Sequence, residues 1–146
     1  MAEITINELP AELRRMHTKA VEAAQRENTD YAIALFAQVL EKMPGFFEGR
    51  KQLRAAQFAK AGAVSTGFFK KMLSGAGSSP QIAKAKLALN KNPAEAMAVA
   101  ESVLGGDPNN LMAHRIIVDA AVALEMPQTQ VFELRSEEHT SELQSL

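Results

Sequence analysis

An all-α fold is predicted for this chain of 146 residues by its composition and by the spacing of its apolar residues. Apolar residues make up 47% of the chain, which is enough to form a core. They are mostly Ala and Leu, with one Tyr and no Trp, a mixture that favours helix over strand. They recur at intervals of three and four residues in successive segments separated by turn-forming residues. We find no strand candidate, so we expect one all-α domain.

The last twelve residues, 135–146, differ in character from the rest of the chain. Residues 135–145 read RSEEHTSELQS, which is the translation, in one reading frame, of a common short-read sequencing adapter. We therefore interpret 135–146 as an artefact of sequence assembly and exclude it from the predictions, as a fusion scar is excluded. The natural domain is then 1–134, and we expect the natural protein to continue past Leu134.

Three helices are predicted in the first part of the chain. In the first helix, Leu13, Met16 and Ala20 recur at helical spacing after Pro10, a residue tolerated at a helix start. An Asn-Thr-Asp sequence interrupts the pattern and can cap the second helix. Gly62 ends the third helix, a common position for glycine. The expected ranges are 12–26, 31–42 and 47–61.

Up to five further helices are predicted in the second part. A less regular segment containing Phe68 and Met72 precedes a linker rich in Gly and Ser at 74–80. Asn92 followed by Pro93 is a strong helix-start signal. Pro127 separates the last two helices. The expected ranges are 63–73, 81–89, 93–104, 111–124 and 128 onward, the last being cut at 134 by the tail.

The second and sixth predicted helices carry the same spacing of small and apolar residues. In both, a small residue is followed by residues four and eight positions later, and then by a proline that ends the helix. These residues are Ala32, Phe36, Leu40 and Pro44 in one copy and Ala96, Ala100, Leu104 and Pro108 in the other. The spacing resembles the second helix and exit turn of the tetratricopeptide repeat, a helix hairpin of 34 residues.

This resemblance, which covers roughly 12–134, implies a right-handed solenoid of antiparallel helix hairpins. It amounts to about 3.5 repeats, the last truncated at the tail. Pro44 and Pro108 are 64 residues apart, four fewer than two repeats of 34, so the middle repeat at 47–92 is expected to be irregular. One hairpin cannot bury its apolar stripe alone, and stacking of neighbours supplies the missing contacts.

Residues suited to catalysis or to metal binding are not grouped in the sequence. The chain has no Cys, and outside the tail its two His residues, His17 and His114, are far apart. No Gly-rich phosphate loop follows a strand, and no Ser lies in a nucleophile-elbow sequence. We expect no enzyme activity, no cofactor and no metal. The N-terminus does not resemble a signal peptide and no long apolar run is present, so we expect a cytoplasmic protein.

The resemblance also implies a binding groove. In tetratricopeptide arrays the first helices of successive hairpins line a concave groove that holds a peptide or a helix of a partner protein. The implied function is therefore a non-catalytic protein-interaction scaffold. Carried over by position, the groove residues are Arg14, His17, Val21, Gln25, Lys51, Ala55, Phe58, Arg115 and Asp119. His17 and Val21 stand where the family's carboxylate clamp needs Lys and Asn, so that clamp is not expected. Core packing for Phe58 and a solvated helix position for His17 are the simpler interpretations.

Charge is segregated along the chain. Residues 1–48 carry 5 basic and 8 acidic side chains, residues 49–94 carry 9 basic and no acidic ones, and residues 95–134 carry 1 basic and 6 acidic ones. The basic segment predicts an acidic peptide segment as the partner. A solvated basic face is an equally simple interpretation. The predicted basic patch consists of Arg50, Arg54, Lys60, Lys70, Lys71, Lys84, Lys86 and Lys91.

An alternative function is a peripheral adaptor that uses 50–91 to bind an anionic membrane or a nucleic acid. Phe68 and Phe69 beside Lys70 have the chemistry to dock on an anionic membrane surface, although burial of the two rings is the favoured interpretation. Nucleic acid is the less favoured partner, because phosphate binding needs basic side chains along one track and here they are scattered over three predicted helices.

Overall fold

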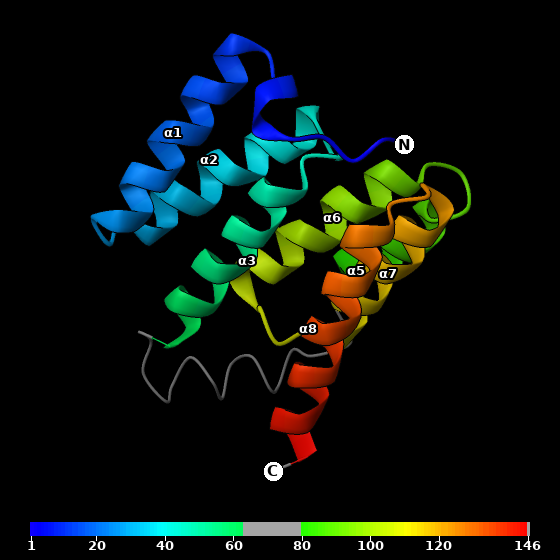
Figure 1. The fold of residues 1–146 in the computed structure, drawn as a ribbon. Coiled ribbons are helices and arrows are strands. Elements are labelled where there is room, and N and C mark those ends of the chain that lie inside the picture. The colour runs from blue at the N-terminus through cyan, green and yellow to red at the C-terminus, as the bar shows by residue number, and fades with distance from the viewer. Residues whose placement is uncertain (63–79, 146) are drawn as a thin grey trace. The chain divides into compact units, whose positions relative to one another are not determined.

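The computed structural model of the chain describes residues 1–62 and 80–145, and these form seven α-helices and one short 3₁₀ helix (Figure 1). The chain divides into two compact units, Met1–Ala63 and Val64–Leu146, which are considered separately here. Among the described residues, the single β interaction is an isolated bridge between Ile4 and Phe46. The predicted all-α fold is confirmed. The predicted helix at 63–73 and most of the linker after it lie outside the described residues.

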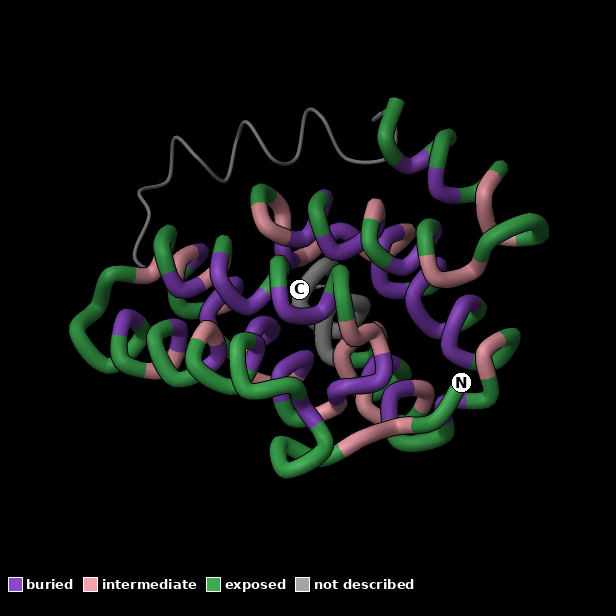
Figure 2. Tube along the Cα trace, turned by 90° about the horizontal axis from the view of Figure 1, so that it is seen from above, coloured by how far each residue is buried: buried purple, intermediate pink, exposed green. Residues whose placement is uncertain are grey.

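The first unit consists of three helices and an N-terminal segment. The elements are η1 (Ile6–Glu8), α1 (Ala11–Gln25), α2 (Thr29–Lys42) and α3 (Phe47–Gly62). Helix α1 packs against α2, α2 packs against α3, and α1 also contacts α3. Each helix therefore buries one side and exposes the other (Figure 2). The helix ends agree with the predicted ranges within two residues, because the turn residues that mark them are unambiguous.

The N-terminal segment lies against the turn between α2 and α3. The backbone N–H of Ile4 donates a hydrogen bond to the carbonyl of Gly45 at 2.8 Å. A Cβ atom at Gly45 would lie 2.1 Å from the carbonyl oxygen of Ala2, so any other residue there would displace the segment. Leu9 completes the attachment by burying its side chain in the first core.

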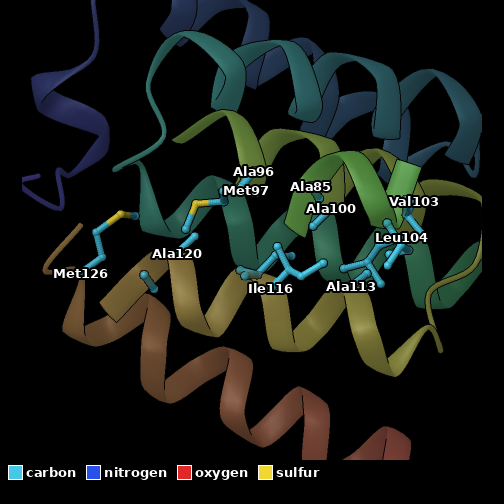
Figure 3. Packing of buried hydrophobic residues seen from close by; sticks show 13 residues of the cluster. Ala85, Ala96, Met97, Ala100, Val103, Leu104, Ala113, Ile116, Ala120 and Met126 are labelled. Carbon is cyan, nitrogen blue, oxygen red and sulfur yellow. The ribbon is translucent and has the colours of Figure 1, made fainter. Parts of the chain in front are cut away.

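The second unit contains four described helices. They are α5 (Pro80–Ala88), α6 (Pro93–Gly106), α7 (Leu111–Ala123) and α8 (Pro127–Ser145). Each packs against the next, and α5 also contacts α7. Ala100, Leu104, Ile116 and Ala120 lie in the core between these helices (Figure 3).

Polar side chains cap two of the helix starts in this unit. The side-chain oxygen of Asn92 accepts a hydrogen bond from the backbone N–H of Glu95 at 3.2 Å, and that of Asn110 accepts from Ala113 at 3.0 Å. The cap expected at Asn92 is therefore confirmed. At the start of α2, Asn28 occupies the capping position but its side chain makes no capping hydrogen bond.

The two repeated segments found in the sequence have the same local structure. The small residues Ala32 on α2 and Ala96 on α6 are both 0% exposed. Each helix ends with the same backbone hydrogen bond, from Met43 to Val39 and from Asp107 to Val103, both at 2.9 Å. A close helix contact at the small residue and an identical helix end account for the 64-residue spacing.

Candidate functional site

The turn proline of each unit is held by a buried side chain six residues further along the chain. In the first unit, Nη2 of Arg50 donates to the carbonyl oxygen of Pro44 at 3.1 Å. In the second, Nε2 of His114 lies 2.8 Å from the carbonyl oxygen of Pro108. The donors are 1% and 0% exposed, respectively. Two different residue types thus fix the same turn from the helix that follows it.

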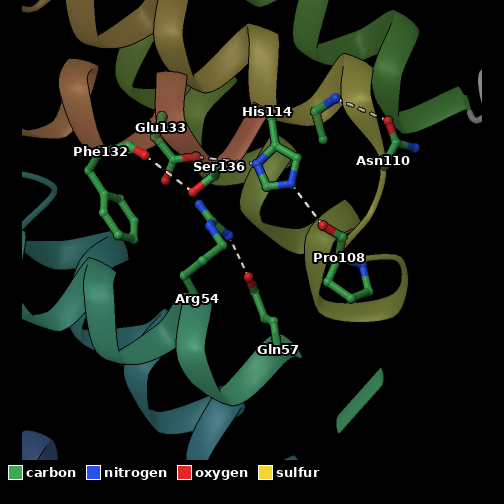
Figure 4. Close-up of polar contacts among 9 residues, drawn as sticks. Arg54, Gln57, Pro108, Asn110, His114, Phe132, Glu133 and Ser136 are labelled. Carbon is green, nitrogen blue, oxygen red and sulfur yellow. Dashed lines mark hydrogen bonds and ion pairs between the residues drawn. The ribbon is translucent and has the colours of Figure 1, made fainter. Parts of the chain in front are cut away.

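His114 also contacts a buried carboxyl group on α8. Its Nδ1 lies 3.3 Å from Oε2 of Glu133, and both side chains are 0% exposed (Figure 4). Because the carbonyl of Pro108 can only accept, Nε2 must carry a hydrogen. The contact at Nδ1 then holds one proton, either on the imidazolium or on the Glu133 carboxyl group. Since neither group reaches solvent, this pair fastens α8 to α7 and does not form a site for a substrate.

His17 is a core residue, and its predicted position in the groove is wrong. It is 4% exposed, and its ring contacts Phe36 and Phe46, with ring centres 5.6 Å and 4.9 Å away. Nδ1 has no hydrogen-bond partner among the described residues. Burial lowers the pKa of His17 from its usual 6.5, and the nearby charge of Glu48 partly opposes this. The interpretation of His17 as a solvated residue is also wrong, because its helix turns it toward the core.

Two residues of the predicted basic patch are buried. Arg50 and Arg54 are 1% and 2% exposed, although both were expected on an exposed surface. Arg50 is the donor to Pro44. Arg54 donates to the side-chain oxygen of Gln57 one turn later on α3 (Figure 4). Sequence alone assigns arginines to the surface, but a long side chain can bury its stem and satisfy its head group with protein acceptors.

The remaining residues of the patch differ in their surroundings. Nζ of Lys60 pairs with Asp30 on α2 at 2.8 Å. Lys84, Lys86 and Lys91 are exposed in the second unit, around a Leu87 side chain that is 78% exposed. Lys70 and Lys71, together with Phe68 and Phe69, lie outside the described residues.

On α1, Arg14 and Gln25 are exposed and Val21 is half-buried. The most exposed face of this helix is turned away from the predicted groove positions. A shallow depression on that face is lined by Ala11, Arg14, Arg15, Thr18, Lys19 and Glu22. Sequence reasoning missed this basic face because the segment as a whole is acidic.

On α3, the predicted groove residues form one stripe. Ala55 is exposed, and Lys51 and Phe58 are partly exposed. Nζ of Lys51 lies 2.9 Å from Glu48 and 5.0 Å from the centre of the Phe47 ring. The stripe therefore combines a cation, its carboxylate partner and aromatic surface.

On α7, the predicted groove residues Arg115 and Asp119 are both exposed and lie one turn apart. Nε of Arg115 lies 2.8 Å from Oε1 of Glu137 on α8. Val122 continues the same face with a 52% exposed side chain. The α7 stripe thus repeats the pattern of a cation with a carboxylate beside exposed apolar surface.

Comparisons of the chain with protein-family models, with curated proteins and with solved structures found no match. Within the described residues, no group of three or more His, Cys, Asp or Glu side chains is placed to hold a metal ion. None of the described helices has the length and apolar character needed to cross a membrane.

Proposed function

We propose that this chain is a non-catalytic interaction domain of the tetratricopeptide repeat type, which binds an acidic peptide or helix of a partner protein. The observation that carries the proposal is the recurrence, 64 residues apart, of a buried small residue, a proline turn and an exposed cation on the following helix. Such an arrangement suits a repeat whose interior is fixed and whose exposed helix face is variable.

The exposed cations support an acidic partner. Lys51 and Arg115 each stand seven residues after the turn proline of their unit, and each already holds a carboxylate oxygen within 2.9 Å. Aromatic and aliphatic side chains flank both positions. A partner segment with carboxylates and apolar side chains would complement either stripe, with the charges guiding association and the apolar groups prolonging it.

The proposal is tested with a fluorescein-labelled acidic peptide in which Glu and Leu alternate. We expect saturable binding in a fluorescence anisotropy titration, weakening as salt rises toward 1 M, where the screening length is ~3 Å. Lys51→Glu and Arg115→Glu should weaken binding. Lys42→Glu, an exposed change at the end of α2, is the matched control and should have little effect.

A second candidate function is supported by α5. Leu87 is the most exposed of the large apolar residues in the described chain, and Lys84, Lys86 and Lys91 surround it. This grouping would suit an anionic membrane surface. Sedimentation with phosphatidylserine vesicles that is lost in Leu87→Ser, while the acidic peptide shows no binding, would favour the membrane adaptor over the protein scaffold.

A further inference from the structure

The exposed face of α7 has a defined order of side chains. Met112, Arg115, Asp119 and Val122 follow one another at intervals of three and four residues and therefore share one face of the helix. At 1.5 Å per residue, Arg115 and Val122 lie about 10 Å apart along the axis. We call these four residues the α7 stripe. Its chemistry is one cation, one carboxylate and apolar groups at both ends.

A carboxylate already occupies the cation of this stripe. Oε1 of Glu137 accepts from Nε of Arg115 at 2.8 Å, and the two residues are 22 positions apart in the chain. The Arg115 side chain remains 54% exposed. Ion pairs this exposed contribute little, because water solvates both charges when the pair opens. A carboxylate from another molecule can therefore compete with Glu137.

The first unit has a cation at the same place with a different carboxylate. Lys51 on α3 pairs with Glu48, three residues earlier on the same helix. The cation recurs at a fixed distance after the turn proline, whereas the source of the carboxylate differs. This contrast indicates that the position selects a carboxylate ligand and does not depend on one particular partner residue.

We propose that Arg115 is the point at which the α7 stripe receives a carboxylate of the partner, and that Glu137 occupies this point in the present chain. The proposal rests on the proposed function and specifies it further. The partner segment places a carboxylate on Arg115 and an apolar side chain on Val122. Asp119, between the two, disfavours a second carboxylate at the next turn of the partner.

The test compares the full chain with Glu137→Gln, which removes the competing charge. Glu138→Gln is the matched control, because it makes the same charge change at an adjacent exposed position. The probe is the fluorescein-labelled peptide of alternating Glu and Leu. We expect Glu137→Gln to bind about two- to fivefold more tightly than the full chain, given the strength of exposed ion pairs, and Glu138→Gln to bind as the full chain does.

A second measurement locates the contact. The ¹⁵N signal of the Arg115 Nε–H group, assigned by its loss in Arg115→Gln, should move when the peptide is added to Glu137→Gln. Equal affinities for Glu137→Gln and Glu138→Gln would overturn the inference. A stationary Arg115 signal with binding elsewhere would also overturn it but leave the proposed function standing. Absence of peptide binding by every variant at low salt would overturn both.

Discussion

His17 places a titratable ring inside the first core, where the second unit has an aliphatic side chain. Three residues after His17 stands Ala20, and three residues after Ile82 stands Ala85; both alanines are 0% exposed. His17 and Ile82 therefore occupy matching positions on α1 and α5. Because burial lowers the pKa of His17, the folded state resists its protonation.

This difference predicts a pH dependence that one substitution removes. Below pH 6.5 the unfolded chain takes up a proton at His17, whereas the folded chain does so only at a lower pH, so stability falls as pH decreases through this window. His17→Ile should reduce the loss of unfolding free energy between pH 7.5 and about 5.5, measured by urea denaturation. Equal losses in the variant and the parent chain would mean that His17 does not titrate between the two states.

Ala32 and Ala96 form close helix contacts that do not accommodate a larger side chain. Ala32→Leu and Ala96→Leu should each lower the free energy of unfolding by roughly 1–3 kcal/mol through overpacking. The matched controls are Ala34→Leu and Ala98→Leu, which make the same change at exposed positions of the same helices. Thermal or urea denaturation measures all four. If the buried and exposed pairs behaved alike, the repeat spacing would be coincidental.

At the scale of the elements, α1 and α7 end in the same turn. The residue after each helix cap, Glu27 or Glu125, has a positive φ, 60° and 56°, respectively. The next N–H reaches back five residues, from Asn28 to Ala23 and from Met126 to Ala121, both at 2.9 Å. These bonds define a Schellman motif, in which glycine normally holds the left-handed position.

Glycine should therefore stabilise both turns. Glu27→Gly and Glu125→Gly are each expected to raise the free energy of unfolding by up to ~1 kcal/mol, since they remove the strain of a left-handed side chain. Glu22→Gly within α1 makes the same exchange at a helical position and should instead destabilise by about 1 kcal/mol. Chemical denaturation of the three variants gives the comparison. A destabilisation at 27 and 125 would indicate that the glutamate side chains contribute to the turn.

The last helix differs between its beginning and its end. Met126, just before α8, and Thr129 and Glu133 within it are all 0% exposed, whereas none of the described tail residues 135–138 is buried. If the tail derives from an adapter, its removal should change little. We expect the chain ending at Leu134 to melt within a few degrees of the full chain by circular dichroism. A larger fall in Tm would count against the adapter origin of 135–146.

At the scale of the whole molecule, the helices could be predicted from the sequence and much of the site could not. Helix ranges follow from apolar periodicity and from Pro, Gly and Asn at the turns, which are local signals. The burial of Arg50 and His17 depends on which way α3 and α1 face, which is decided by packing between helices. A comparison of the two copies would have pointed to both, because Arg50 matches the buried His114 and His17 matches Ile82.

The distribution of charge also changes between sequence and structure. The basic segment is continuous in the sequence, but Arg50 and Arg54 are consumed inside the first unit and Lys60 pairs with Asp30. Of the described cations in that segment, Lys84, Lys86 and Lys91 remain on the surface beside Leu87. A net charge counted along the chain therefore overstates the basic surface that a partner meets.

In both units, each helix packs chiefly against its neighbour in sequence, from α1 to α3 and from α5 to α8. The chain thus closes short loops almost everywhere, and little entropy is lost before native contacts form. Proteins with such low contact order refold in microseconds to milliseconds. The attachment of Ile4 to Gly45 is an exception, since it joins residues some forty positions apart. In a stopped-flow experiment, the helices of the first unit should therefore form before its N-terminal segment docks.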